Sequence, residues 1–425
     1  EYAAGYEDLV GRIAAVGQLP EGCCGPDTKV IDAAGKYLAP GFIDAHIHIE
    51  SSMLTYTEFA KMVIKHGTTA VASDLMEVTI VSGVEGMKEV LAESEHTPVK
   101  LYYPVPAFME ENGLQTTGST LYASMMDELI QLPQAVGLAE VLVPPILAGS
   151  PASAHMLELA EKYHKTAEGH APATYGEALN AYVSTGINSD HESTNPEEAL
   201  QKLRAGLRVL MREGSASTDL RACLKIITEN KVDTRHCAMV SDDIDALHIK
   251  DLGHLDHKVR IAVAEGVDPV TAIQMVTLNP AESFHIDGEC GSLTPGKYAD
   301  VVLLSSLEEC RVEQVVSKGE LIVDHGALTR QLEAPAYSGK LRNTIHIPAI
   351  TGEDLVVKTD PGASRATVHV IGASPVSLLT EDLAVTLPVE NGVVQPDVDN
   401  DILRIACVER YGKNGSIGRA FIKNF

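Results

Sequence analysis

The sequence has no tryptophan, few aromatic residues, no long apolar run and no Cys-x-x-Cys pair. Aromatic residues make up only 4% of the 425 residues, which argues against a base-stacking platform for single-stranded nucleic acid. No apolar run reaches about 18 residues, so we expect no transmembrane helix, and no segment at the start of the chain resembles a signal peptide. The seven cysteines are scattered and form no Cys-x-x-Cys. We therefore expect reduced thiols, a cytoplasmic location and no cysteine-based zinc site.

Basic residues are also scarce, and the formal net charge is -26. This charge repels nucleic acid and anionic membranes, so we expect neither as a partner. It suits a site that concentrates divalent cations, although a solvated acidic surface is the commoner meaning of such a charge. The hydrophobic content of 45% is that of a globular protein, and the length favours two or three domains.

The middle of the chain, residues 40–285, alternates apolar strand-like runs with helical stretches. We predict helices at residues 56–66, 83–93, 152–164, 195–204, 217–230 and 253–265. Such alternation matches the size of a closed (β/α)₈ TIM-like barrel. A doubly wound open sheet is the rival, but no G-x-G-x-x-G follows a first strand. We count eight strands, with predicted ends near His48, Asp74, Pro106, Val141, His170, His191, Glu213 and Asp242.

Both flanks of this region are rich in short strand patterns. Residues 11–17 and 29–32 are predicted strands, and residues 312–317 and 320–323 are a predicted hairpin. We therefore predict one small β-sandwich module built from residues 1–39 and 286–331. Residues 332–425 are again strand-rich and punctuated by proline and glycine, which predicts a third, C-terminal domain.

Two histidines in one predicted strand suggest a metal site. The segment 38–49 is mostly apolar and predicts a buried strand, and residues two apart on a strand face the same side. His46 and His48 would thus project together, well placed to hold one metal ion. A chance His-x-His or a packed pair is the alternative.

Further histidines and carboxylates lie at other predicted strand ends, where TIM-like barrels place reactive groups. A single carboxylate there is usually a helix cap, and a single histidine usually forms a hydrogen bond. Buried carboxylates that are clustered together would repel one another, and a pair of divalent cations would remove that repulsion. We therefore predict a metal centre from the ensemble. These side chains are Asp74 with Glu77, Glu140, His170, the run Asp190-His191-Glu192 and the run Ser241-Asp242-Asp243.

The motifs that carry these residues resemble the adenine deaminase family of the amidohydrolase superfamily. They are PGFIDAHIHIESS at 40–52, GLAE at 137–140, GHAP at 169–172, SDHE at 189–192 and SDD at 241–243. Residues 266–281 and 295–300 resemble the last barrel helix and the returning strand of that family. The likeness runs from Gly11 to about Val323 and resumes over residues 408–425.

The resemblance implies a binuclear centre. One metal would be held by His46, His48 and Asp242, the other by His170 and His191, and Glu140 would bridge them. Iron or manganese is the usual metal of the family, and zinc is the alternative. Asp74, Glu77 and Glu50 would lie in the substrate region.

The same resemblance implies hydrolytic deamination of adenine to hypoxanthine and ammonia by a metal-bridging hydroxide. Its catalytic residues would be Asp242, Glu140, His191 and Glu77; Asp242 would relay the proton and Glu77 would act near N1 of the purine. The alternatives are deamination of another heterocycle, hydrolysis of a cyclic amide, or a non-catalytic scaffold. A zinc deaminase of the base-editing type is disfavoured, because its Cys-x-x-Cys pair is absent.

Three departures from the family pattern accompany the resemblance, and one of them is that the N-terminal module starts late. The family usually has Asp-Pro-His-Glu where this chain has Asp74-Leu-Met-Glu77, so a histidine is missing near the substrate region. Members also usually continue beyond the point that corresponds to Phe425, so we expect this chain to be shortened or part of a longer one. A small-molecule purine is the expected partner, and we expect a homo-oligomer.

Overall fold

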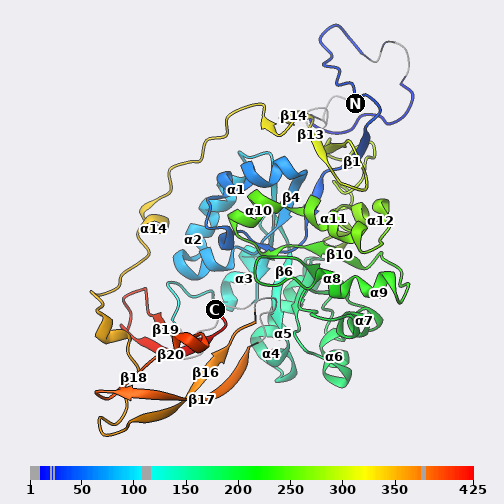
Figure 1. Ribbon diagram of the computed structural model, residues 1–425. Coiled ribbons are helices and arrows are strands. Elements are labelled where there is room, and N and C mark those ends of the chain that lie inside the picture. The colour runs from blue at the N-terminus through cyan, green and yellow to red at the C-terminus, as the bar shows by residue number, and fades with distance from the viewer. Residues whose placement is uncertain (1–9, 20–21, 23, 108–115, 375–379) are drawn as a thin grey trace. The chain divides into compact units, whose positions relative to one another are not determined.

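The computed structural model describes residues 10–19, 22, 24–107, 116–374 and 380–425 (Figure 1). Its described residues divide into two compact units. The larger unit holds residues up to 78, 87–109 and 121–336, as far as they are described, and the smaller unit holds 337–425 with 79–86 and the described part of 110–120. No described helix is long and apolar enough to cross a membrane.

The larger unit contains eight parallel strands in one sheet, in the order β10-β9-β8-β7-β6-β5-β4-β2. Figure 1 shows helices arranged around this sheet. The prediction of eight barrel strands is confirmed, and seven of them end within two residues of the predicted positions. The strands are β2 (Phe42–Asp44), β4 (Thr68–Ala72), β5 (Lys100–Pro106), β6 (Ala135–Leu142), β7 (Thr166–His170), β8 (Ser189–Asp190), β9 (Arg208–Arg212) and β10 (Cys237–Val240).

The predicted single strand over residues 38–49 is wrong, because the structure breaks it into three. Pro40 ends the first piece, and Gly41 lies so close to Thr69 that an added Cβ would meet its Oγ1 at 2.1 Å. This close approach lets the chain leave the small sheet and enter the barrel at Phe42. The pieces are β1 (Tyr37–Pro40), β2 and β3 (Ile47–His48).

Helices follow most of the barrel strands, as predicted. Asn195 caps α7 by accepting a hydrogen bond from the Glu198 backbone N–H at 3.0 Å. The predicted helix 83–93 begins earlier, at Met76, and is interrupted at Gly83, whose φ is 75°. The helices are α1 (Tyr56–Val63), α2 (Met76–Ser94), α3 (Ala123–Leu129), α4 (Val143–Leu147), α5 (Pro151–Lys162), α6 (Gly176–Val183), α7 (Pro196–Arg204), α8 (Leu220–Cys223), α9 (Lys225–Thr228), α10 (Ala246–Leu252), α11 (Leu255–Ala264), α12 (Pro269–Gln274) and α13 (Leu278–Ser283).

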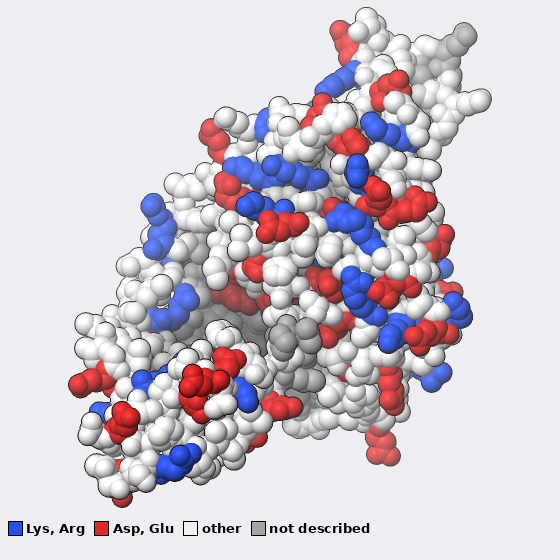
Figure 2. Space-filling model, viewed as in Figure 1, with Lys and Arg blue, Asp and Glu red and all other residues white. Residues whose placement is uncertain are grey.

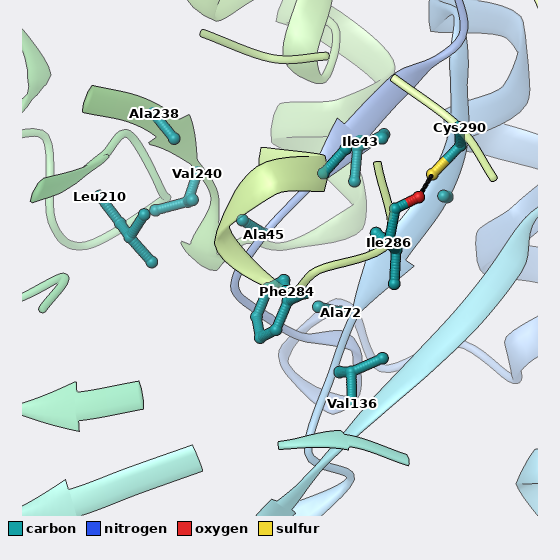
Figure 3. Close-up of a cluster of buried hydrophobic side chains, with 12 residues drawn as sticks. Ile43, Ala45, Ala72, Val136, Leu210, Ala238, Val240, Phe284, Ile286 and Cys290 are labelled. Carbon is teal, nitrogen blue, oxygen red and sulfur yellow. Dashed lines mark hydrogen bonds between the residues drawn. The ribbon is translucent and has the colours of Figure 1, made fainter. Parts of the chain in front are cut away.

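Apolar side chains fill the barrel interior. Ala70 and Ala72 from β4, and Leu210 from β9, belong to one buried cluster that also contains Phe284 and Ile286 from beyond α13 (Figure 3). Because strand side chains alternate, Asp74 and Arg212 continue the same inward-facing rows two residues later. The packed interior therefore leaves the carboxyl ends of the strands as the place for polar side chains.

A buried carboxylate closes the barrel between its first and last strands. Asp44 at the end of β2 accepts hydrogen bonds from the Ser241 backbone N–H at 3.1 Å and from its hydroxyl at 2.5 Å. His254 Nε2 lies 3.2 Å from the same carboxylate. One step further, β3 pairs in parallel with β11 (Asp242–Asp243), which joins the two ends of the sheet at the rim.

Both flanks of the barrel contribute to one five-stranded antiparallel sheet, where the sequence predicted a β-sandwich module. β1 from the N-terminal flank pairs with β12, and the predicted hairpin is β13 with β14. The predicted strands at 11–17 and 29–32 are wrong: Arg12 makes one isolated bridge to Tyr298, and residues 29–32 form no strand. The remaining strands are β12 (Val301–Leu304), β13 (Val312–Ser317), β14 (Glu320–Asp324) and β15 (Ala327–Leu328).

The smaller unit is built on a second five-stranded sheet, in the order β18-β17-β16-β20-β19. Alternating apolar residues, among them Val370, Leu387 and Phe421, form its buried face. The prediction that this region is strand-rich is confirmed. Its strands are β16 (Arg365–Gly372), β17 (Glu381–Glu390), β18 (Val393–Val394), β19 (Ile402–Val408) and β20 (Ile417–Lys423), and one short helix, α14 (Gly339–Arg342), precedes them.

We predict that Asp44→Ala lowers the free energy of unfolding by about 2–4 kcal/mol, because it leaves the buried Ser241 and His254 groups without their acceptor. Urea unfolding followed by circular dichroism measures this change. Asp251→Ala, at an exposed position of α10, is the matched control and is expected to stay near the parent. Equal unfolding midpoints for the two variants would contradict the role of Asp44 in closing the barrel.

Candidate metal centre

Six side chains that the sequence singled out meet at the carboxyl ends of the barrel strands. Glu140 lies in β6 and His170 ends β7, while His191 directly follows β8. The others come from the rim where the barrel closes: His46, His48 and Asp242. Five of the six are buried, and the side chain of His170 is 29% exposed, so the cluster is reached from solvent on the His170 side.

Glu140 lies at the middle of the cluster and faces all four imidazoles. Its Oε1 is 3.6 Å from Nε2 of His46, 3.5 Å from Nε2 of His48 and 3.3 Å from Nε2 of His191. Its Oε2 is 2.7 Å from Nδ1 of His170. One carboxylate oxygen thus faces three rings while the other faces the fourth, so Glu140 is in reach of every histidine of the cluster.

Asp242 completes the cluster from the opposite side of the rim. Its Oδ1 is 3.5 Å from Nε2 of both His46 and His48, and its backbone N–H donates to the His46 carbonyl at 3.0 Å. The other oxygen, Oδ2, accepts a hydrogen bond from Arg212 at 3.0 Å. The Oδ1 atom is therefore the one that is directed at the histidines.

The backbone is strained at both central carboxylates. Glu140 and Asp242 each have a φ of 57°, a left-handed conformation that non-glycine residues rarely adopt. At Glu140 the pairing of β6 with β7 shifts register between Leu138 and Val141, as in a β-bulge. Strain of this kind persists where surrounding contacts impose it, and here it turns each carboxylate toward the histidines.

The donor atoms fit divalent cations. Two sets of three, His46-His48-Glu140 and Glu140-His170-His191, each offer ligand atoms that lie within 4.8 Å of one another, and Glu140 belongs to both. Nε2 of His46 and Nδ1 of His170 are buried without a hydrogen-bond partner among the described residues, although carboxylate oxygens face them. Unpaired nitrogen and oxygen donors that converge on common points are what metal ligands require.

The carboxylates of this cluster attract positive charge to the imidazoles. Burial lowers the pKa of His46, but Glu168 and Asp242 outweigh it and raise that pKa to about 9. Burial raises the pKa of Glu140, yet His191 and His170 hold it well below its usual range. The carboxylates thus stay ionised and the histidines attract protons. A divalent cation would meet the same demand, because it supplies positive charge at the point the ligands share.

A second group of acids lies beside His48. Asp74 Oδ1 is 3.4 Å and Glu77 Oε2 is 3.7 Å from Nδ1 of His48, and Glu50 accepts a hydrogen bond from the Val78 backbone N–H at 3.2 Å. Burial and the neighbouring carboxylates raise the pKa of Glu50 to about 8. Burial and Asp74 raise that of Glu77 to about 7, against the opposing effect of His48. The structure therefore brings together all three residues expected in the substrate region.

Three further residues contact the proposed ligands, and of these only Glu192 was among the side chains that the sequence singled out. Glu168 lies behind His46 and His191, and buried Arg212 contacts Asp242 and Glu192. Glu192 Oε1 in turn is 3.3 Å from Nε2 of His191. Glu168 precedes His170 by two positions in β7, so strand alternation was the available signal. The sequence offered no corresponding signal for the contacts of Arg212.

We predict that Glu140→Gln weakens divalent metal binding by at least about 10–100-fold, the loss that removal of even an outer partner of a ligand typically causes. Metal content after dialysis, measured by plasma mass spectrometry, tests this. Glu177→Gln makes the same chemical change at an exposed position of α6 and is expected to retain the metal of the parent. Equal metal content in both variants would exclude Glu140 as a ligand.

Two parts of the chain match known family models. Residues 37–322 match the model of the amidohydrolase family, and residues 377–425 match that of the adenine deaminase C-terminal domain. The chain is 39% identical over 420 residues to an adenine deaminase of Moorella thermoacetica, covering 98% of this chain and 70% of the relative. An adenine deaminase of Clostridium botulinum is 38% identical over 419 residues, with the same coverage of 98% and 70%.

Solved structures share the fold at low sequence identity. The crystal structure of an adenine deaminase superposes with a TM-score of 0.55 at 16% identity and covers 74% of this chain and 93% of its own. A beta-aspartyl dipeptidase of Fervidobacterium islandicum superposes with a TM-score of 0.57 at 15% identity, covering 76% and 92%. These likenesses show the barrel architecture, which supports more than one reaction.

Proposed function

Because this chain belongs to the adenine deaminase family of the amidohydrolases, we propose that it uses water to hydrolyse adenine to hypoxanthine and ammonia. The observation that carries the proposal is the identity of 36–39% to curated adenine deaminases over nearly the whole chain. The cluster around Glu140 supports it, because hydrolytic displacement of an amino group from a purine needs an activated water. The substrate is thus a small purine.

Two divalent cations fit the donor set best. His46, His48 and Asp242 would hold one, and His170 and His191 the other, with Glu140 shared between them. Iron or manganese suits these nitrogen and oxygen donors, with zinc as the alternative; the cluster contains no cysteine among the described residues. When bound, such cations lower the pKa of water and make a hydroxide nucleophile available near neutral pH.

Asp242 is suited to move the proton. Its Oδ2 is held by Arg212, while Oδ1 faces His46 and His48. A carboxylate fixed in this way can accept the proton of the attacking water and return it to the departing amino group of adenine. Burial raises the pKa of Asp242, but His46 and the neighbouring histidines lower it strongly, so the group is ionised and ready to act as a base.

Glu77, Asp74 and Glu50 are suited to bind the purine ring. Adenine presents ring nitrogens that accept hydrogen bonds, so a carboxylic acid that keeps its proton near neutral pH is a matching donor. The pKa of Glu77 is raised to about 7 and that of Glu50 to about 8. Glu77 would protonate the ring near N1 as water adds to C6, and the other two would orient the ring.

We predict that Asp242→Asn lowers kcat for ammonia release from adenine by at least about 100-fold, because general acid–base groups typically contribute that much or more. Bound metal is expected to be retained in part. Asp287→Asn, at an exposed position, is the matched control and should keep the turnover of the parent. Coupled measurement of ammonia, with hypoxanthine identified by chromatography, tests both variants. Unchanged ammonia release in Asp242→Asn would rule out this role.

A panel of substrates separates this reaction from other amidohydrolase reactions. Metal-loaded protein is expected to release ammonia from adenine, and not to open cyclic amides. A ring-opened product would contradict the proposal and favour a cyclic amide hydrolase. Ammonia released from another heterocycle, and not from adenine, would favour a different deaminase. Metal uptake of less than about one equivalent, with no turnover, would favour a non-catalytic scaffold. Homo-oligomeric assembly and a cytoplasmic location stay predictions of the sequence.

A further inference from the structure

Glu168 is a buried carboxylate that the proposed reaction leaves without a role. It lies in β7, two residues before His170, and is 1% exposed. Its Oε1 is 2.7 Å from Nδ1 of His46 and 3.5 Å from Nδ1 of His191. No other described group is a hydrogen-bond partner of either of its oxygens. Burying a carboxylate is costly unless it is paired, and the two imidazoles are the partners that compensate the charge of Glu168.

The two imidazoles lie in matching orientations. The rings of His46 and His191 are stacked, with centroids 3.7 Å apart and planes 17° from parallel. On one side both rings turn Nδ1 toward Glu168. On the other side both turn Nε2 toward Oε1 of Glu140, at 3.6 Å and 3.3 Å.

This orientation fixes which nitrogen is available to a cation. A neutral imidazole carries its proton on one nitrogen and a free lone pair on the other. A carboxylate at Nδ1 holds the proton there, and the lone pair of Nε2 then points toward Glu140. A carboxylate at the outer nitrogen also makes the ring a better ligand.

Glu168 differs from the other outer partners because it serves both metal positions. His48 has its own outer partner, Asp74, at 3.4 Å from Nδ1. His170 presents Nδ1, not Nε2, to Glu140. His46 and His191 belong to different proposed cations, so Glu168 contacts one proposed ligand of each from the outer side.

We propose that Glu168 is a positioning residue of the metal centre, which holds His46 and His191 with Nε2 toward Glu140 and thereby links the two cation positions. The inference deepens the proposed function and rests on its ligand assignment, not on the identity of the substrate. A role that was only structural would affect folding and leave metal affinity unchanged.

The test compares three variants of the whole chain. Glu168→Gln keeps the shape of the side chain and removes its charge, while Glu168→Asp keeps the charge on a shorter side chain. Glu93→Gln is the matched control: Glu93 is another buried glutamate of the larger unit, and it accepts hydrogen bonds from Thr57 N–H at 2.9 Å and from its hydroxyl at 2.7 Å. Each metal-free protein is titrated with Mn²⁺ alone, and free Mn²⁺ is measured by electron paramagnetic resonance. Thermal unfolding of the metal-free proteins is recorded in parallel.

We expect Glu168→Gln to weaken both Mn²⁺ binding steps by about 10–100-fold, Glu168→Asp to recover part of that loss, and Glu93→Gln to bind as the parent does. Parent-like binding by Glu168→Gln would overturn the proposal, and so would equal losses in the two glutamine variants. Should Glu168→Gln fail to fold, the aspartate variant decides: binding weaker than in Glu93→Gln supports the role, and parent-like binding overturns it. A parent that binds two Mn²⁺ but releases no ammonia from adenine would refute the proposed reaction alone.

Discussion

The contact of one carboxylate with four imidazoles is the interaction on which the rest of the site depends. Glu140 brings His46, His48, His170 and His191 to a common point, although they come from three separate parts of the barrel rim. Buried carboxylates in this arrangement repel one another unless protons or cations compensate their negative charge. The roles proposed for Asp242 and Glu168 both depend on that common point.

The barrel explains how such a cluster can exist. Packed apolar side chains fill its interior, so polar side chains gather where the strands end. Asp44 closes the seam between the first and last strands and so places His46 and Asp242 side by side. Over the face seen in Figure 2, acidic and basic side chains are interspersed. The net charge of -26 is therefore not concentrated in a single acidic patch on that face.

Much of this could be predicted from the sequence because strand ends in a parallel barrel share one rim. His46, Glu140, His170 and Asp242 follow from that rule as candidates, and the family resemblance implies their roles as ligands. The rule failed where the backbone departs from a regular strand. Residues 38–49 break at Gly41, because the approach of Thr69 depends on tertiary packing that no local pattern encodes.

The outer contacts were harder to predict for a related reason. Strand alternation indicates the side to which Glu168 points, but its proposed role depends on two imidazole rings that stack only in the folded chain. Arg212 lies in an apolar strand, and its partners Asp219 and Asp242 are fixed by loops and by the left-handed φ at Asp242. Periodicity indicates which face a side chain takes, but it does not give the contacts made across the rim.

Anomalous diffraction from crystals of the Mn²⁺-loaded protein tests the central claim most directly. The account predicts two manganese peaks, one beside His46, His48 and Asp242 and one beside His170 and His191. Both should lie within about 2.0–2.3 Å of oxygens of Glu140, the usual range for such bonds. Manganese bound elsewhere, or a Glu140 that touches neither ion, would contradict it.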